Sequence, residues 1–239
     1  MSMKNLLPGI FFLMVSCVNQ GKTDRVHDTK HFKIYYTVLD DDSIKDIADS
    51  LENCYPKITS QLQSGDLPVV NVHLYKNITE LTHAFPDFPS WAVGQATSDS
   101  TIHMISPNDP KQDYPQMIRN LKHEFTHCVS MSINSTIGNN PRWLWEAVAL
   151  YEANNPWDPH MLPYLVNQKP PTLKELNEYS NPRIYEVGYF IAQFIAETHG
   201  ANALKSLIQN NGNIQDTLKI DDEEFTKQWF AFVKQKFEI

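Results

Sequence analysis

Residues 120–129 read "NLKHEFTHCV" and place two histidines and a glutamate in a segment whose apolar residues have helical spacing. Leu121, Phe125 and Cys128 occupy positions i, i+4 and i+7, which form one stripe along a helix. We predict a helix that begins near Asp113 and turns this stripe toward the core. The polar residues between the apolar ones need a separate explanation.

His123 and His127 are four residues apart, so they lie one above the other on one helix face. Glu124 points about 100° away from His123 around the helix. In this H-E-x-x-H arrangement two neutral imidazoles bind zinc, and the carboxylate remains free to handle a proton. The alternative is a paired histidine face that is solvated or hydrogen-bonded in the core.

A third metal ligand is available in the next helical segment, "RWLWEAVALYEA". We predict Asn140 as its N-cap and Pro141 as its first residue. Glu146 follows one turn later, between small residues that include Ala147 and Ala149, which allow close helix approach. A catalytic zinc ion takes three protein ligands of this kind, so Glu146 is the candidate third ligand.

"HEFTH", then 18 residues, then Glu146 in "WLWEAVALY" resembles the gluzincin metallopeptidases, the peptidase MA-like clan of thermolysin and the zinc aminopeptidases. Ala147 stands where a glycine is usual in that motif. The resemblance implies a thermolysin-like metallopeptidase domain of α+β class. It also implies zinc as cofactor, Glu124 as the general base and three metal ligands, His123, His127 and Glu146.

The later stretch "PRIYEVGYF" is similar to the helix in zinc aminopeptidases that carries a transition-state tyrosine. On that match Tyr185 donates a proton or hydrogen bond to the oxyanion, and the alternative is a packed structural ring. The strand around residues 95–105 corresponds to the substrate-binding edge strand of the family. The G-x-M-E-N motif that holds a substrate amino terminus is absent, which favours an endopeptidase.

The predicted secondary structure changes near residue 110. Residues 31–110 alternate short strands with helices, and residues 111–239 have helical periodicity nearly throughout. The strands include one at 31–39, one at 67–75, and a strand pair or a single long strand at 92–106. We therefore expect one domain over residues 31–239, a small mixed sheet followed by a mainly helical half.

The N-terminus predicts export. A basic Lys4, a short apolar run and the order Met-Val-Ser before Cys17 resemble a bacterial lipoprotein signal over residues 1–16, with Cys17 as the lipidated residue. An ordinary cleaved leader is the alternative. Residues 17–30 are polar and are expected to form a tether, so the protein is placed in the cell envelope, anchored to the membrane by lipid.

The composition limits the partners. A formal charge of −8 and the lack of a Lys/Arg cluster argue against nucleic acid. A peptide or protein substrate is expected, and the alternative is a non-catalytic surface lipoprotein that keeps the zinc site and binds peptide or glycan. Cys54 and Cys128 are the two cysteines outside the leader, and they form either a disulfide or two buried thiols.

Overall fold

The computed structural model describes residues 25–86, 88–89, 91–200 and 202–239. A five-stranded mixed sheet comes first and is followed by helices, as expected from the sequence. The strand order is β1-β2-β3-β5-β4, where the central strands run parallel and the two edge strands run antiparallel to their neighbours. The strands are β1 Arg25–Asp28, β2 Phe32–Tyr36, β3 Val70–Tyr75, β4 Gly94–Ser98 and β5 Thr101–Ile105.

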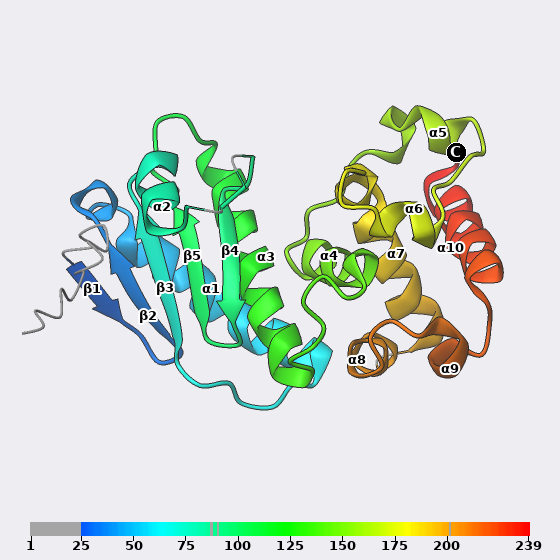
Figure 1. Cartoon of the computed structure of the whole chain (residues 1–239), viewed down its shortest axis with the longest axis horizontal. Helices are drawn as coiled ribbons and strands as arrows, with labels where there is room; N and C mark the ends of the chain where they lie inside the picture. Colours follow the sequence, from blue (N-terminus) through cyan, green and yellow to red (C-terminus); the bar gives the residue numbers. More distant parts are fainter. Residues whose placement is uncertain (1–24, 87, 90, 201) are drawn as a thin grey trace, which may run out of the picture.

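The sheet is apolar on one face because its register aligns buried side chains across the strands. Ile34 pairs with Val72, which pairs with Ile102, and all three are fully buried. Helices α1 (Ile44–Leu62) and α3 (Tyr114–Ile133) cover this face (Figure 1). The connection β2-α1-β3 is the crossover that a parallel strand pair requires.

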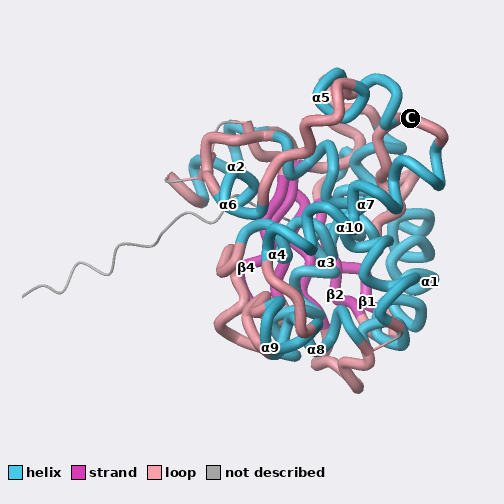
Figure 2. The backbone as a smooth tube through the Cα atoms, turned by 90° about the vertical axis from the view of Figure 1, so that its right-hand side faces the viewer, coloured by secondary structure: helices cyan, strands magenta, loops and turns pink. Residues whose placement is uncertain are grey.

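The helices that follow residue 141 form a second lobe beside the sheet, whereas the short helix after β3 stays with the sheet (Figure 1). Figure 2, seen from the side of this lobe, shows its helices in front of the strands. We call residues 25–133 the sheet lobe and residues 142–239 the helical lobe. The other helices are α2 Ile78–Ala84, α4 Arg142–Glu152, α5 Pro163–Val166, α6 Leu173–Asn177, α7 Arg183–His199, α8 Ala203–Gln209, α9 Ile214–Leu218 and α10 Asp222–Phe237, with single 3-10 turns at Val38–Asp40 and Pro159–Met161.

Helices α4 and α7 pack closely in the helical lobe because small residues face each other. A Cβ atom added to Gly188 of α7 would lie 2.8 Å from Leu150 Cδ1 and 3.1 Å from Ala147 Cα of α4. Ala147 of α4 therefore contacts α7. This contact fixes the helix that carries Tyr185 against the helix that carries Glu146.

Three local predictions differ from the structure or concern residues outside it. Residues 25–28, predicted as part of a tether, form strand β1. Most of its side chains are exposed, so the sequence shows no apolar alternation from which a strand could be predicted. Helix α4 is capped by Pro141 and begins at Arg142, one residue later than predicted. The predicted signal segment, residues 1–16, and the predicted lipidation site Cys17 lie outside the described residues.

Other local predictions are confirmed. Helix α3 begins at Tyr114, beside Asp113, as predicted. Of the alternatives left open, residues 92–106 form a strand pair, β4 and β5, that turns at residues 99 and 100, and Cys54 and Cys128 are free, buried thiols. Within the described ranges, no helix has the length and apolar character needed to cross a membrane.

Candidate metal centre

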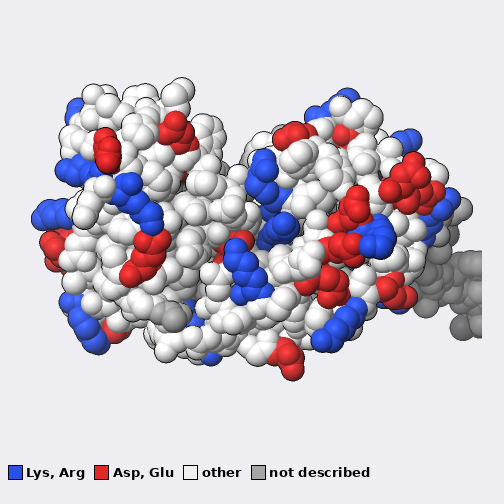
Figure 3. All heavy atoms as spheres, turned by 180° about the vertical axis from the view of Figure 1, so that it is seen from behind, with Lys and Arg blue, Asp and Glu red and all other residues white. Residues whose placement is uncertain are grey.

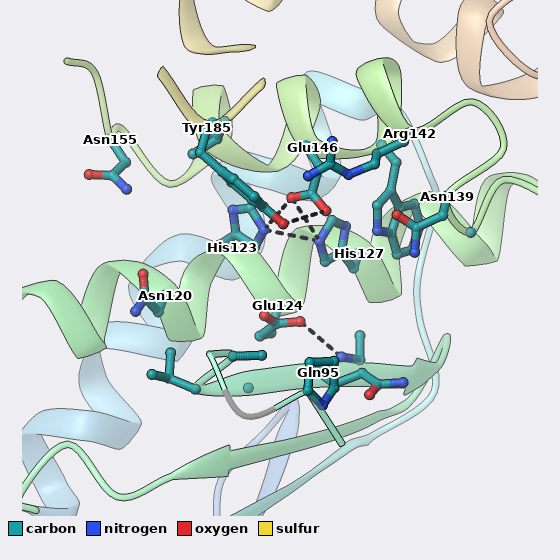
Figure 4. A pocket seen from close by; sticks show the side chains of 18 of the residues that line it. Gln95, Asn120, His123, Glu124, His127, Asn139, Arg142, Glu146, Asn155 and Tyr185 are labelled. Atoms are coloured by element: carbon teal, nitrogen blue, oxygen red, sulfur yellow. Dashed lines mark hydrogen bonds and ion pairs between the residues drawn. The ribbon is translucent and has the colours of Figure 1, made fainter. Parts of the chain in front are cut away.

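Helix α3 brings the two histidines of the motif together. The Nε2 atoms of His123 and His127 lie 3.0 Å apart, and both rings point away from the sheet toward α4 (Figure 4). The indole ring of Trp145, on α4, stacks on His127 with ring centroids 3.8 Å apart. Burial keeps the pKa of His127 well below its ordinary value, so its ring is neutral, as a metal ligand must be.

Glu146 completes a cluster of three metal-binding side chains. Its Oε2 atom lies 3.2 Å from Nε2 of His123 and 4.0 Å from Nε2 of His127. Nitrogen and oxygen ligands at about 2.0–2.1 Å from a tetrahedral zinc ion are about 3.3 Å from each other. The ligand atoms of all three residues lie within 4.8 Å of one another, so they could hold one metal ion.

The hydrogen bonding of Glu146 supports a cation at this position. Its Oε2 atom is buried and has no well-aligned hydrogen-bond donor among the described residues; the nearby polar atom is Nε2 of His123, 3.2 Å away, which is itself a candidate metal ligand and cannot donate when it binds a metal. A buried carboxylate oxygen is costly unless it is hydrogen-bonded or binds a cation. The cluster therefore has the donor types and the spacing that suit a divalent metal ion.

Glu124 lies apart from this cluster, toward the sheet. Its Oε2 atom accepts a 2.8 Å hydrogen bond from the backbone N–H of Ala96 in β4 (Figure 4). A Cβ atom on Gly94 would lie 3.3 Å from Glu124 Cγ, so the absence of a side chain at Gly94 leaves space for Glu124. Burial raises the pKa of Glu124 to about 7. A carboxyl group with this pKa can both accept and release a proton near neutral pH.

Tyr185 reaches the cluster from the start of α7. Its hydroxyl donates to Oε1 of Glu146 over 3.4 Å. Burial and the negative charge of Glu146 raise the pKa of Tyr185 far above its ordinary value, so the hydroxyl keeps its proton. The structure thus brings together all five residues predicted for the site, His123, Glu124, His127, Glu146 and Tyr185.

A cleft of about 500 Å³ opens over these residues, between the two lobes. Figure 3 shows a hollow between the lobes on one face of the molecule, with acidic and basic side chains intermixed on that face. Gly94 and Ala96 of the edge strand line the cleft on the sheet side. Amide side chains line it as well, those of Gln95, Asn120, Asn139 and Asn155.

Arg142 is a site residue that sequence reasoning missed. Its side chain, one turn before Glu146 on α4, lines the cleft although the residue is only 5% exposed. Its Nη1 atom lies 2.9 Å from the carbonyl oxygens of Glu178 and Asn181 and 3.4 Å from that of Leu176. The sequence signal that could have identified Arg142 is its position four residues before Glu146, which puts both side chains on one face of the helix. Arg142 anchors the connection between α6 and α7, just before Tyr185.

We expect Arg142→Met to lower the free energy of unfolding by about 2 kcal/mol, because charged hydrogen bonds to main-chain carbonyls are lost. Arg142→Lys should lose less, since it keeps the charge but not the planar guanidinium. Chemical denaturation measures both values. Arg183→Met is a matched control, because it makes the same substitution at an arginine whose guanidinium contacts a ring, that of Tyr164, and not main-chain carbonyls. Equal stability of Arg142→Met and wild type would contradict the anchoring role.

Glu152, at the end of α4, differs from expectation. The sequence left it as an exposed charge or as a partner of a ligand histidine. The structure buries it to 4% exposure, and neither carboxyl oxygen has a hydrogen bond to a described residue. Burial raises its pKa from 4.5 to about 8, and the positive charge of Lys57 offsets only part of this shift.

Glu152 should make the protein less stable as the pH rises. Between pH 5 and 8 the unfolded chain releases this proton and the folded protein keeps it, so the free energy of unfolding falls. Glu152→Gln removes the titration, and its stability relative to wild type should increase over this window by up to about 4 kcal/mol. Denaturation at each pH measures the difference, with the exposed Glu238→Gln as control. A pH-independent difference would refute a buried, protonated Glu152.

Comparisons with known proteins return no similarity. No family model matches the chain, and neither a curated protein nor a solved structure matches it. The function proposed below therefore rests on the geometry of the site.

Proposed function

We propose that this protein is a zinc-dependent peptidase of the gluzincin type, with a thermolysin-like domain, that hydrolyses peptide bonds. One observation carries the proposal: three metal-binding side chains converge within 4.8 Å, and a base and a phenol flank them in one cleft. A structural zinc site normally has four protein ligands. Here the cluster contains three described residues and lies open to the cleft, which favours a catalytic site.

The mechanism assigns each residue a task. Zinc, when bound by His123, His127 and Glu146, supplies Lewis acidity toward water and the scissile carbonyl. Glu124 takes a proton from the attacking water and passes it to the leaving amine. The protonated hydroxyl of Tyr185 donates a hydrogen bond to the oxyanion that forms on the former carbonyl oxygen.

The edge strand β4 offers a place for an extended peptide. The carbonyl of Val93 accepts a 2.8 Å hydrogen bond from the N–H of Ile105, and bonding to β5 then recurs at every second residue. Gly94 and Ala96 therefore turn their main-chain groups to the free side of β4, and Ala96 already donates there to Glu124. A peptide that adds to this edge would run past the base.

The substrate is proposed to be cut internally. The carboxylates among the described residues that line the cleft are Glu124 and Glu146, and both have tasks at the centre. No further carboxylate of this lining is available to bind a substrate amino terminus. Peptides blocked at both ends should therefore be cleaved.

Export and lipid anchoring at Cys17 remain part of the proposal. They would place the enzyme in the bacterial cell envelope, on the periplasmic or outer side, where proteins or peptides outside the cytoplasm are its substrates.

The proposal is tested by incubating the zinc-loaded protein with a library of end-blocked peptides and identifying new termini by mass spectrometry. Internal cleavage should appear, disappear on chelation and return with zinc. Protein that holds stoichiometric zinc but cleaves no peptide would contradict the proposal. That result would favour the non-catalytic lipoprotein that binds peptide or glycan.

A further inference from the structure

Exposed aromatic side chains are concentrated at the metal cleft. Eight large hydrophobic residues of the described chain are exposed, and three of these are aromatic. They are Trp91, Trp157 and Tyr179, with exposed fractions of 61%, 51% and 65%. All three line the cleft. Exposed apolar surface gathered at one place marks a binding site more often than scattered single residues do.

Two of these rings come together beside the metal ligands. Trp91 belongs to the segment before β4, and Tyr179 to the connection between α6 and α7. The ring centroid of Trp91 lies 6.4 Å from that of Tyr179 and 6.3 Å from that of Tyr185, with both pairs tilted by 61°. The Tyr185 hydroxyl in turn lies 3.4 Å from Glu146. The aromatic surface therefore extends from the reacting centre to solvent.

Each charged side chain that lines the described part of the cleft already has another role. The cleft's acidic, basic and histidine lining residues among those described are the three metal-binding residues, the base Glu124 and Arg142. The guanidinium of Arg142 bonds main-chain carbonyls and lies 5.7 Å from the ring centroid of Tyr179 and 5.3 Å from that of Tyr185. No other charge in the described lining is available to select an acidic or basic side chain, so the aromatic walls select by apolar contact.

We propose that Trp91, Tyr179 and the ring of Tyr185 form a subsite for one bulky apolar side chain of the substrate, preferably an aromatic one, near the bond that is cleaved. This inference rests on the proposed peptidase function and adds a substrate preference to it. Aromatic rings in tilted contact bind a further aromatic ring favourably.

The position of Trp91 favours a peptide as the ligand. Trp91 precedes the first residue of the edge strand, Gly94, by three positions. A peptide that pairs with β4 would therefore pass the aromatic surface while its main chain bonds the strand. Aromatic faces also stack on sugar rings, but the free main-chain groups of a strand match a peptide backbone, so a glycan is an outcome of the test and not the proposal.

The test measures binding separately from turnover. In the zinc-loaded Glu124→Gln protein, end-blocked peptides that differ by one Phe or Ala, placed at each position in turn, are titrated by calorimetry. At one position Phe should bind about tenfold more tightly than Ala. Trp91→Ala or Tyr179→Ala in the same background should reduce this ratio to about threefold or less. Met161→Ala, which removes an exposed side chain that does not line the cleft, should leave the ratio unchanged.

The same peptide pairs are then offered to the protein with Glu124 intact. Cleavage with the same preference, reduced by Trp91→Ala, supports both proposals. Binding preference without any cleavage contradicts the peptidase and leaves the subsite supported. Cleavage or binding without a Phe preference, or a preference that survives both substitutions, overturns the subsite. Binding of an oligosaccharide in place of the peptides overturns it as well.

Discussion

Glu124→Gln is expected to abolish peptide hydrolysis and to leave the metal in place. The substitution keeps the shape of the side chain and an oxygen that can accept from the Ala96 N–H, but it removes the group that takes the proton from water. Loss of a general base typically lowers the rate by about 10²–10⁴-fold. Zinc content should not change, because Glu124 points toward the sheet and away from the three ligands (Figure 4).

Steady-state hydrolysis of one cleaved peptide, with metal analysis of the same sample, checks this expectation. Glu152→Gln is the matched control, because it makes the same Glu-to-Gln change at a buried residue that does not line the cleft, and it should retain activity. Hydrolysis at the wild-type rate by Glu124→Gln would contradict the assignment of Glu124 as the general base. Loss of both zinc and activity would instead show that the substitution disturbs the metal site.

Zinc is expected to stabilise the folded protein strongly. Without a cation, the buried Oε2 of Glu146 has no hydrogen-bond partner among the described residues. A ligand that binds only the folded state adds about 2.7 kcal/mol at 100 times its Kd, and about 4.1 kcal/mol at 1,000 times. Thermal unfolding of metal-free protein should therefore shift to higher temperature on addition of zinc.

This zinc-induced shift should fall sharply in His127→Ala, which removes one ligand. Leu121→Val, a mild change of a buried residue on the same helix, is a control that should lower stability but keep the shift. A shift of equal size in His127→Ala and wild type would place the stabilising zinc elsewhere on the protein.

The sequence predicts the site well where local spacing determines it. The four-residue separation of His123 and His127 defines one helix face in any α-helix, so their convergence follows from periodicity. The contact of Glu146 with them needed a turn and a second helix, which the Asn-Pro start signal predicted, and the motif resemblance supported the contact. The fold class also follows from periodicity, since short strands alternate with helices before residue 110 and helical periodicity follows it.

Long-range packing explains what the sequence did not predict. Trp91 and Tyr179 are far apart in the chain, and each looks like an ordinary loop aromatic until the two lobes bring them together. Strand β1 depends on main-chain pairing with β2 and has no apolar pattern. Glu152 looks like a surface charge at a helix end, and only the tertiary structure buries it.

The most direct test of the metal site is the zinc content of purified protein after reconstitution and removal of free metal, in wild type beside Glu146→Ala. Three converging ligands predict about one zinc per chain in wild type, and clear loss in the variant because two histidines alone hold zinc weakly. Circular dichroism should show that both proteins are folded. Folded wild type without zinc, or equal zinc in the two proteins, would contradict the three-ligand centre.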